Sequence, residues 1–251
     1  MKKIIILLGL FIVLGISAPV FSQTYFKLPP LPAPEEYGNI LICRLSSDSG
    51  MKSVTFSHWS HRTKYTCKVC HFELEFALML NTTPITEEAN QAGLYCGACH
   101  DGEQAFGHTE ENCDKCHNDD IRYNVDKFQE LSHLPKAEFG NEINWSKAIA
   151  EKVITPRKYF DFREDMEPLR FGEELTILAA WNFVPPAVFK HEVHEQWLHC
   201  SNCHPEIFNT KLKSTRGFDM INNLRGEFCG VCHGKVSFPL NNCKRCHPDM
   251  K

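Results

Sequence analysis

The sequence predicts a small, mostly irregular protein of two tandem modules organised around bound groups, without a large continuous sheet or helix bundle. Three observations support this fold class. The 251 residues include 13 cysteines and 13 histidines, a number that points to a metal or a cofactor. The 14 glycines and 14 prolines imply much irregular backbone. The spacing of the cysteines also repeats once along the chain.

The chain begins with a segment typical of an exported protein. Lys2 and Lys3 precede an apolar run over residues 4–16, and small and polar residues follow. We therefore expect residues 1–22 to be a signal peptide and the protein to be periplasmic or extracellular. The alternative is an uncleaved segment that anchors the chain, which would be its one contact with a membrane. The net charge of -4 gives no basic surface for nucleic acid, which we exclude as a partner.

Twelve cysteines form six pairs with the pattern CxxCH. Two cysteines one helical turn apart can form thioethers with the two vinyl groups of a haem, and the following histidine directs its imidazole to the iron. Disulfides, zinc knuckles or redox dithiols would not require a histidine after every pair. The sequence therefore predicts six covalently bound c-type haems, each named below by its CxxCH histidine. The cysteines are Cys67 and Cys70, Cys96 and Cys99, Cys113 and Cys116, Cys200 and Cys203, Cys229 and Cys232, and Cys243 and Cys246; the histidines are His71, His100, His117, His204, His233 and His247.

The spacing of these motifs indicates an internal duplication. The first and second motifs of each half are 29 residues apart, and the phrases VTFSHWSH and AVFKHEVH stand at the same distance before the first cysteine of each half. The middle motif begins with CG in both halves. We therefore expect a Pro-rich linker at 23–38, a first three-haem module at 39–120, an inter-module segment at 121–173 and a second three-haem module at 174–251.

Each module resembles the c7-type triheme cytochromes of the cytochrome c3 superfamily. The resemblance rests on FxHxxH followed by three CxxCH motifs, and it covers residues 54–117 and 187–247. It implies a small multihaem cytochrome fold, in which a β-hairpin, short helices and loops wrap around haem. The residues agree, because 39–56 reads as a hairpin with SSDSG at the turn, and 175–189 reads as another with VPP at the bend. Modules of this size need haem as their core.

The remaining segments carry weaker signals. LPPLPAP at residues 28–34 predicts an extended linker with no packing pattern. Residues 146–154 read as a short helix that stops before Pro156, with the rest of the inter-module segment as loop lying over haem faces. Cys43 is outside the motifs. Its sequence context predicts a small buried side chain, and the alternative is an intermolecular disulfide.

The resemblance also implies the second axial ligand of each iron. It pairs His58 with His71, His61 with His100, His191 with His204, and His194 with His233. For the third haem of a module it implies a ligand nine residues before the middle motif, which is Met220 for the His247 haem. The first module has Glu87 there, so we expect His108 to complete the His117 haem; Met79, His133 and His199 are the alternatives.

These ligands predict an electron carrier rather than an enzyme. An iron with two axial ligands has no position for a substrate, so we expect no catalytic residues. By resemblance, the partners are other cytochromes or redox proteins, including quinol-oxidising membrane complexes and outer-membrane conduits. Two alternatives remain at this stage. One is a multihaem reductase with an open iron at the His117 haem, and the other is a subunit of a polymeric cytochrome wire.

Overall fold

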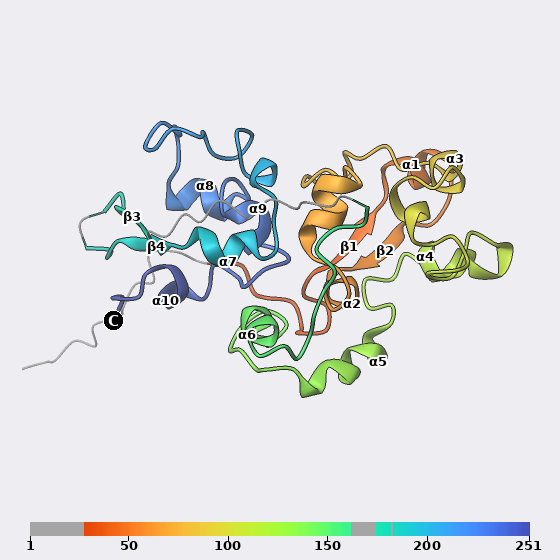
Figure 1. Cartoon of the computed structure of the whole chain (residues 1–251), viewed down its shortest axis with the longest axis horizontal. Coiled ribbons are helices and arrows are strands. Elements are labelled where there is room, and N and C mark those ends of the chain that lie inside the picture. The colour runs from red at the N-terminus through yellow and green to blue at the C-terminus, as the bar shows by residue number, and fades with distance from the viewer. Residues whose placement is uncertain (1–27, 162–173, 182) are drawn as a thin grey trace, which may run out of the picture.

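The computed structural model describes residues 28–161, 174–181 and 183–251, so the predicted signal peptide and part of the inter-module segment lie outside the described residues. Figure 1 shows the first module at one end of the molecule, the second at the other, and the inter-module segment with α5 (Val125–Phe128) and α6 (Trp145–Ala150) running beside both. Among the helices in these ranges, none has the length and apolar character that a membrane span requires.

The first module consists of one hairpin and several helices of five residues or fewer. Strands β1 and β2 pair antiparallel with Ile40 opposite Phe56, as the sequence predicts. The predicted turn between them is wrong in one respect, because residues 44–48 form a helix. The elements are β1 (Asn39–Ile42), α1 (Arg44–Asp48), β2 (Val54–Ser57), α2 (His58–Arg62), the π-helix η1 (Val69–Glu73), α3 (Glu87–Gln91), the 3-10 helices η2 (Tyr95–Ala98) and η3 (Glu110–Asn112), and α4 (Cys113–Cys116).

The second module repeats this plan. Strands β3 and β4 pair antiparallel with Leu175 opposite Phe189, which confirms the second predicted hairpin. The VPP motif stands directly before β4 rather than midway between the strands. The elements are β3 (Leu175–Ile177), β4 (Ala187–Phe189), α7 (His191–Glu195), η5 (Cys200–Asn202), α8 (Met220–Leu224), α9 (Gly230–His233) and α10 (Cys243–Cys246).

The glycine of each CG motif has the same steric reason in both modules. A Cβ atom on Gly97 would lie 1.8 Å from the carbonyl oxygen of Asn90, and one on Gly230 would lie 1.8 Å from that of Asn223. No side chain can occupy so short a distance from a main-chain atom, so only glycine lets the middle motif pack against α3 or α8. The duplication seen in the sequence is therefore a duplication of packing.

The inter-module segment is more helical than the sequence predicts. Helices α5 (Val125–Phe128) and η4 (Gln129–His133) occupy residues that we expected to be loop. The predicted helix at 146–154 forms as α6 (Trp145–Ala150) but ends earlier, because Lys152 adopts a φ of 56° and the Val153 N–H turns back to the Ala148 carbonyl. Short helices without a long apolar pattern give little periodic signal, which explains both errors.

A tryptophan core lies where the modules and the inter-module segment meet. Trp59 comes from α2 of the first module and Trp197 follows α7 of the second, and both are buried. The inter-module segment contributes the other four buried members, so it does more than cover haem faces. We call this cluster the tryptophan core; its buried members are Trp59, Leu134, Ile143, Trp145, Ala148 and Trp197.

The end of the Pro-rich segment packs against the rest of the protein, so the prediction of a linker without packing is wrong there. Tyr37 is only 2% exposed, and its hydroxyl donates to the Ser237 carbonyl of the second module at 2.7 Å. The Asn141 side chain donates to the Pro34 carbonyl at 2.9 Å. Residues 34–37 therefore connect the inter-module segment to the second module.

Candidate haem sites

All six CxxCH histidines are held in the same way. The Nδ1 atom of each lies within hydrogen-bond distance of a main-chain carbonyl, and because a carbonyl only accepts, Nδ1 carries the proton. Nε2 is then left with its lone pair for a metal, as in other metal-bound histidines. The pairs are His71 with Phe76 at 2.8 Å, His100 with Phe106 at 3.0 Å, His117 with Lys52 at 2.9 Å, His204 with Phe208 at 2.6 Å, His233 with Phe238 at 2.9 Å, and His247 with Pro185 at 2.7 Å.

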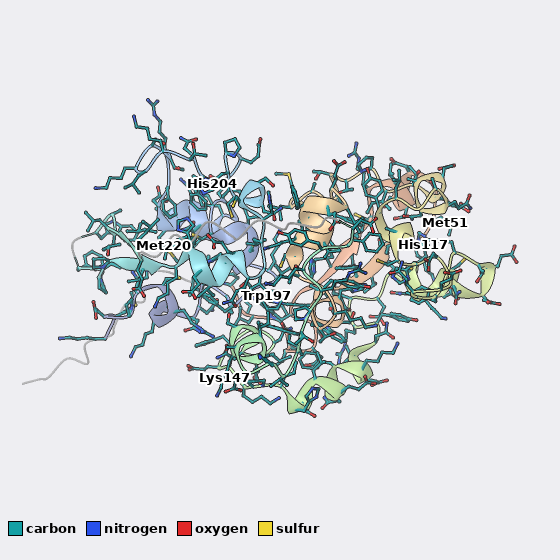
Figure 2. All side chains as sticks on the ribbon, in the orientation of Figure 1. Met51, His117, Lys147, Trp197, His204 and Met220 are labelled. Carbon is teal, nitrogen blue, oxygen red and sulfur yellow. The ribbon has the colours of Figure 1, made fainter. Side chains whose placement is uncertain are left out.

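The hairpins explain the position of the third motif in each module. The acceptor for His117 is Lys52, just before β2, and the acceptor for His247 is Pro185, just before β4. Helix α4 packs against β2, and α10 packs against β4. Figure 2 shows His117 in the outer part of the first module, away from Trp197 near the middle of the molecule.

The FxHxxH phrase orders two histidines around one phenylalanine. The Phe56 ring meets His58 edge-on, with centroids 4.9 Å apart at 88°, and stacks on His61 at 4.4 Å and 27°. Phe189 repeats both contacts with the histidines of α7, at 4.9 Å and 90° and at 4.4 Å and 30°. In each module, one phenylalanine ring thus contacts both imidazoles of the phrase and orients them differently. This contact explains why the motif contains a phenylalanine.

The second histidine of each phrase lies near the histidine of the middle motif, with which the resemblance pairs it. The ring centroids of His61 and His100 are 6.3 Å apart, and those of His194 and His233 are 6.1 Å apart. Two metal–nitrogen bonds of about 2.0 Å, plus about 1.1 Å from each nitrogen to its ring centre, require about 6.2 Å. Both pairs therefore fit one iron between two imidazoles. His58 lies within electrostatic range of its predicted partner His71, and His191 begins α7 as His58 begins α2.

Burial keeps these imidazoles neutral. It lowers the pKa of His58 and of His233 to about 4, against a smaller opposing effect of the hydrogen bond at Nδ1. Burial also lowers the pKa of His61, His100 and His194. A neutral imidazole is the form that binds a metal, so this environment suits axial ligands.

The cysteines of the CxxCH motifs are free, and several of their thiols are strongly buried. Burial raises the pKa of Cys70, Cys96, Cys229 and Cys232 to about 12. Such thiols are protonated at neutral pH, unlike the reactive thiolates of redox dithiols. The described residues contain no cluster of three or more ligand-type side chains that could hold a metal ion by themselves.

Glu87 and Met220, which the sequence places at equivalent positions of the two modules, can be compared in the structure. Glu87 and Met220 both occupy the first position of the helix before the middle motif, α3 and α8 respectively. Met220 is half-buried, whereas Glu87 is exposed and accepts a hydrogen bond from the Gln91 side chain. The correspondence read from the sequence is therefore present in space. That Met220 binds the iron of the His247 haem stays a prediction.

The candidates for the His117 haem lie in different places. His108 lines a cavity of about 600 Å³ together with His100, which it influences electrostatically, so it lies beside the middle motif. His133 bonds to the Glu130 carbonyl of its own helix, and Met79 is 72% exposed. The role of His108 as a ligand stays a prediction.

His199 has a structural role that the sequence did not reveal. Its Nδ1 accepts a hydrogen bond from the Ser201 N–H at the start of η5, and its ring stacks on Phe72 of the first module at 3.7 Å. Nearby, the Asn202 side chain donates to the His71 carbonyl at 2.8 Å. The first motifs of the two modules therefore lie side by side.

Cys43 is held within the first module. It is half-buried, its N–H donates to the Asn81 side chain at 2.9 Å, and its sulfur accepts from the same side chain at 3.3 Å. This environment agrees with the expectation of a small packed side chain.

Comparisons with known proteins give one family match and several similar solved structures. The family model described as cytochrome c7 and related cytochrome c matches residues 54–118 and 187–248. Among solved structures, the C-terminal hexaheme fragment of GSU1996 is 24% identical, with a TM-score of 0.28 over 87% of this chain and 98% of that chain. The dodecaheme cytochrome c GSU1996 is also 24% identical, with a TM-score of 0.27 over 87% of this chain and 48% of that chain. No curated protein gives a significant match.

The two matched regions coincide with the two repeats of hairpin, FxHxxH helix and three CxxCH motifs, and together they make up half of the chain. Each region carries three motifs whose histidines have the environment of haem ligands. The protein is thus a multihaem c-type cytochrome with two c7-like regions, and it belongs to the family of cytochrome c7 and related cytochrome c.

Proposed function

We propose that the chain is an exported hexahaem c-type cytochrome that carries electrons between redox partners in a periplasmic or extracellular respiratory chain, without catalysing bond chemistry. The observation that carries the proposal is the shared environment of the six CxxCH histidines, each fixed by a main-chain carbonyl. The facing imidazoles of His61 and His100, and of His194 and His233, add two sites without room for a substrate.

The side chains of this protein would hold haem rigidly. Haem, when bound, supplies a one-electron iron couple. The paired cysteines would fix its position, and the histidines would be the ligands of its iron. Because the Nδ1 hydrogen bonds and the phenylalanine contacts hold the rings, the ligands need little rearrangement when an electron arrives or leaves, which favours rapid transfer.

The proposed partners are other cytochromes or redox proteins, including quinol-oxidising membrane complexes and outer-membrane conduits. The support for them is the resemblance to c7-type modules, together with the apolar start of the chain at residues 4–16 that favours export. A small electron carrier exchanges electrons through weak and transient contacts, so we expect these complexes to be short-lived.

The mass of the purified protein tests the proposal. Expression in a host that exports and matures c-type cytochromes should give a chain without residues 1–22 that carries six haems, and the haems should titrate reversibly. A mass with five haems or fewer, or bound zinc in place of haem, would contradict it. Recovery of the mature protein from the cytoplasm alone would contradict export.

A reductase with one open iron is the second candidate function, and the exposed Glu87 at the position of Met220 favours it. Carbon monoxide added to the reduced protein distinguishes the two. An electron carrier with six saturated irons should bind none, whereas an open His117 haem should bind one equivalent. Reduction of nitrite or hydroxylamine by the same sample would establish the second function.

If Met220 is a ligand, the third haems of the two modules should have different reduction potentials. A thioether ligand raises the potential of a haem above that of a bis-histidine haem, so the His247 haem should be reduced first in a titration. Replacing Met220 by leucine keeps the bulk and removes the sulfur, and should abolish this highest potential. Glu87→Leu serves as the matched control and should leave it in place. Survival of the highest potential in Met220→Leu would show that the sulfur is not a ligand.

A further inference from the structure

Arg62 is a cation enclosed at the boundary between the modules. It ends α2, directly after the predicted ligand His61, and its guanidinium carbon lies 4.9 Å from the centre of the Trp145 ring and 4.3 Å from that of Trp197. One tryptophan belongs to the inter-module segment and the other to the second module. The Arg62 Nη1 atom also donates to the Val236 carbonyl of the second module at 3.3 Å. Arg62 therefore touches all three parts of the chain.

The charge of Arg62 has no opposite charge beside it in the described residues. The ion pairs found there do not include Arg62, and its Nε atom is buried without a hydrogen-bond partner. Arginine keeps its proton in proteins, and two aromatic faces stabilise the cation without neutralising it. The protein thus encloses a positive charge that no carboxylate of the described residues pairs with, in a region of low dielectric constant where its field reaches further than at the surface.

Two haem-attachment motifs, one from each module, lie next to this charge. Cys67 packs against the tryptophan core, and the Lys68 N–H beside it donates to the Trp197 carbonyl at 3.0 Å. On the other side, the N–H of Val236 donates to the Cys232 carbonyl at 2.9 Å, so the residue that Arg62 contacts is tied to the middle motif of the second module. Cys67 and Cys232 thus lie on either side of Arg62, and each is close enough for the charge of Arg62 to act on it.

We propose that Arg62 is a fixed positive charge that raises the reduction potentials of the His71 haem and the His233 haem. The inference deepens the proposed function and rests on it, because it requires haem at both motifs. The direction of the shift in reduction potential follows from the charge of iron. The oxidised site is more positive than the reduced site, so a neighbouring cation favours the reduced site and raises the potential.

The test uses the full-length, six-haem protein and follows the potential of each haem separately by NMR of the haem methyl groups during a redox titration. Arg62→Met keeps much of the bulk and removes the charge. This variant should have lower reduction potentials at the His71 and His233 haems. At a fixed applied potential, the ratio of reduced to oxidised haem should fall about tenfold, which corresponds to a shift in reduction potential of about 59 mV. The other four haems should keep their potentials. Arg62→Lys should keep the wild-type values.

A matched control removes an exposed arginine. Arg122 is 62% exposed and pairs with Glu36 at 3.4 Å, so Arg122→Met should leave all six potentials unchanged. The shift in Arg62→Met should also persist at high salt, because ions screen buried charges less than exposed ones.

Three results would overturn the inference. Unchanged potentials in an Arg62→Met protein with six haems would refute it while leaving electron transfer intact. An equal shift in Arg62→Lys would assign the effect to packing rather than charge. If Arg62→Met and Arg62→Gln both failed to acquire six haems while Arg62→Lys acquired them, Arg62 would be an assembly residue and not a determinant of potential. Absence of haem from the wild-type protein would instead refute the proposed function itself.

Discussion

Replacing His61 by alanine is expected to convert one haem of the six from low spin to high spin. The ring centres of His61 and His100 are 6.3 Å apart, which fits one iron between them. Loss of the ring removes one strong axial ligand and leaves the His100 haem open. Absorption and electron paramagnetic resonance spectra should show high-spin iron at about one sixth of the total, and the reduced variant should bind one equivalent of carbon monoxide.

The second module offers the matched experiment. His194→Ala should open the His233 haem in the same way, because its ring centroid is 6.1 Å from that of His233. His133→Ala is the control, since His133 bonds to the Glu130 carbonyl within its own helix and faces no CxxCH histidine in the described residues. Spectra of His61→Ala that stay fully low-spin would refute the assignment of His61. High-spin iron in His133→Ala would identify His133 as a ligand instead.

Replacing Trp197 by alanine should strongly destabilise the contact between the modules. Trp197 is 4% exposed, packs in the tryptophan core and covers one face of the Arg62 guanidinium. Truncation of a buried tryptophan costs about 3–5 kcal/mol, and here the loss falls on the cluster that joins three parts of the chain. Thermal unfolding should begin at a lower temperature, and small-angle X-ray scattering should show a longer molecule with all haems retained.

The exposed Leu178 provides the comparison for this variant. It is 77% exposed, so Leu178→Ala should change the free energy of unfolding by about 0.5 kcal/mol or less. If Trp197→Ala unfolds at the wild-type temperature and keeps the wild-type scattering profile, the tryptophan core does not hold the modules together.

The parts of the fold that could be predicted from the sequence are those formed by residues close together along the chain. A CxxCH motif, a hairpin and an FxHxxH phrase each place their chemistry within a few positions, so spacing alone identifies them. The equivalence of Glu87 and Met220 could also be predicted from the sequence, because the two copies of the module can be aligned with each other. Local spacing therefore accounts for most of each module.

The boundary between the modules could not be predicted in this way. Trp59, Trp145 and Trp197 are far apart in the sequence and share no period, so nothing in the chain indicated that they form one cluster. Arg62 lies in the polar stretch SHRTK, which reads as a solvated surface, and only the folded chain encloses it between two rings. Gly97 was visible as part of a repeated motif, but its steric reason required the position of the Asn90 carbonyl.

The main-chain acceptors of the six CxxCH histidines have a consequence for how this protein can evolve. A peptide carbonyl is present whichever side chain a residue carries, and it does not titrate. Substitutions at the acceptor positions Phe76, Phe106 or Phe208 leave the proton on Nδ1 and the donor strength of Nε2 in place. Substitutions at these positions should therefore not change how the CxxCH histidines bind iron. Selection can change the reduction potential of each haem through the surrounding charges and the identity of the sixth ligand.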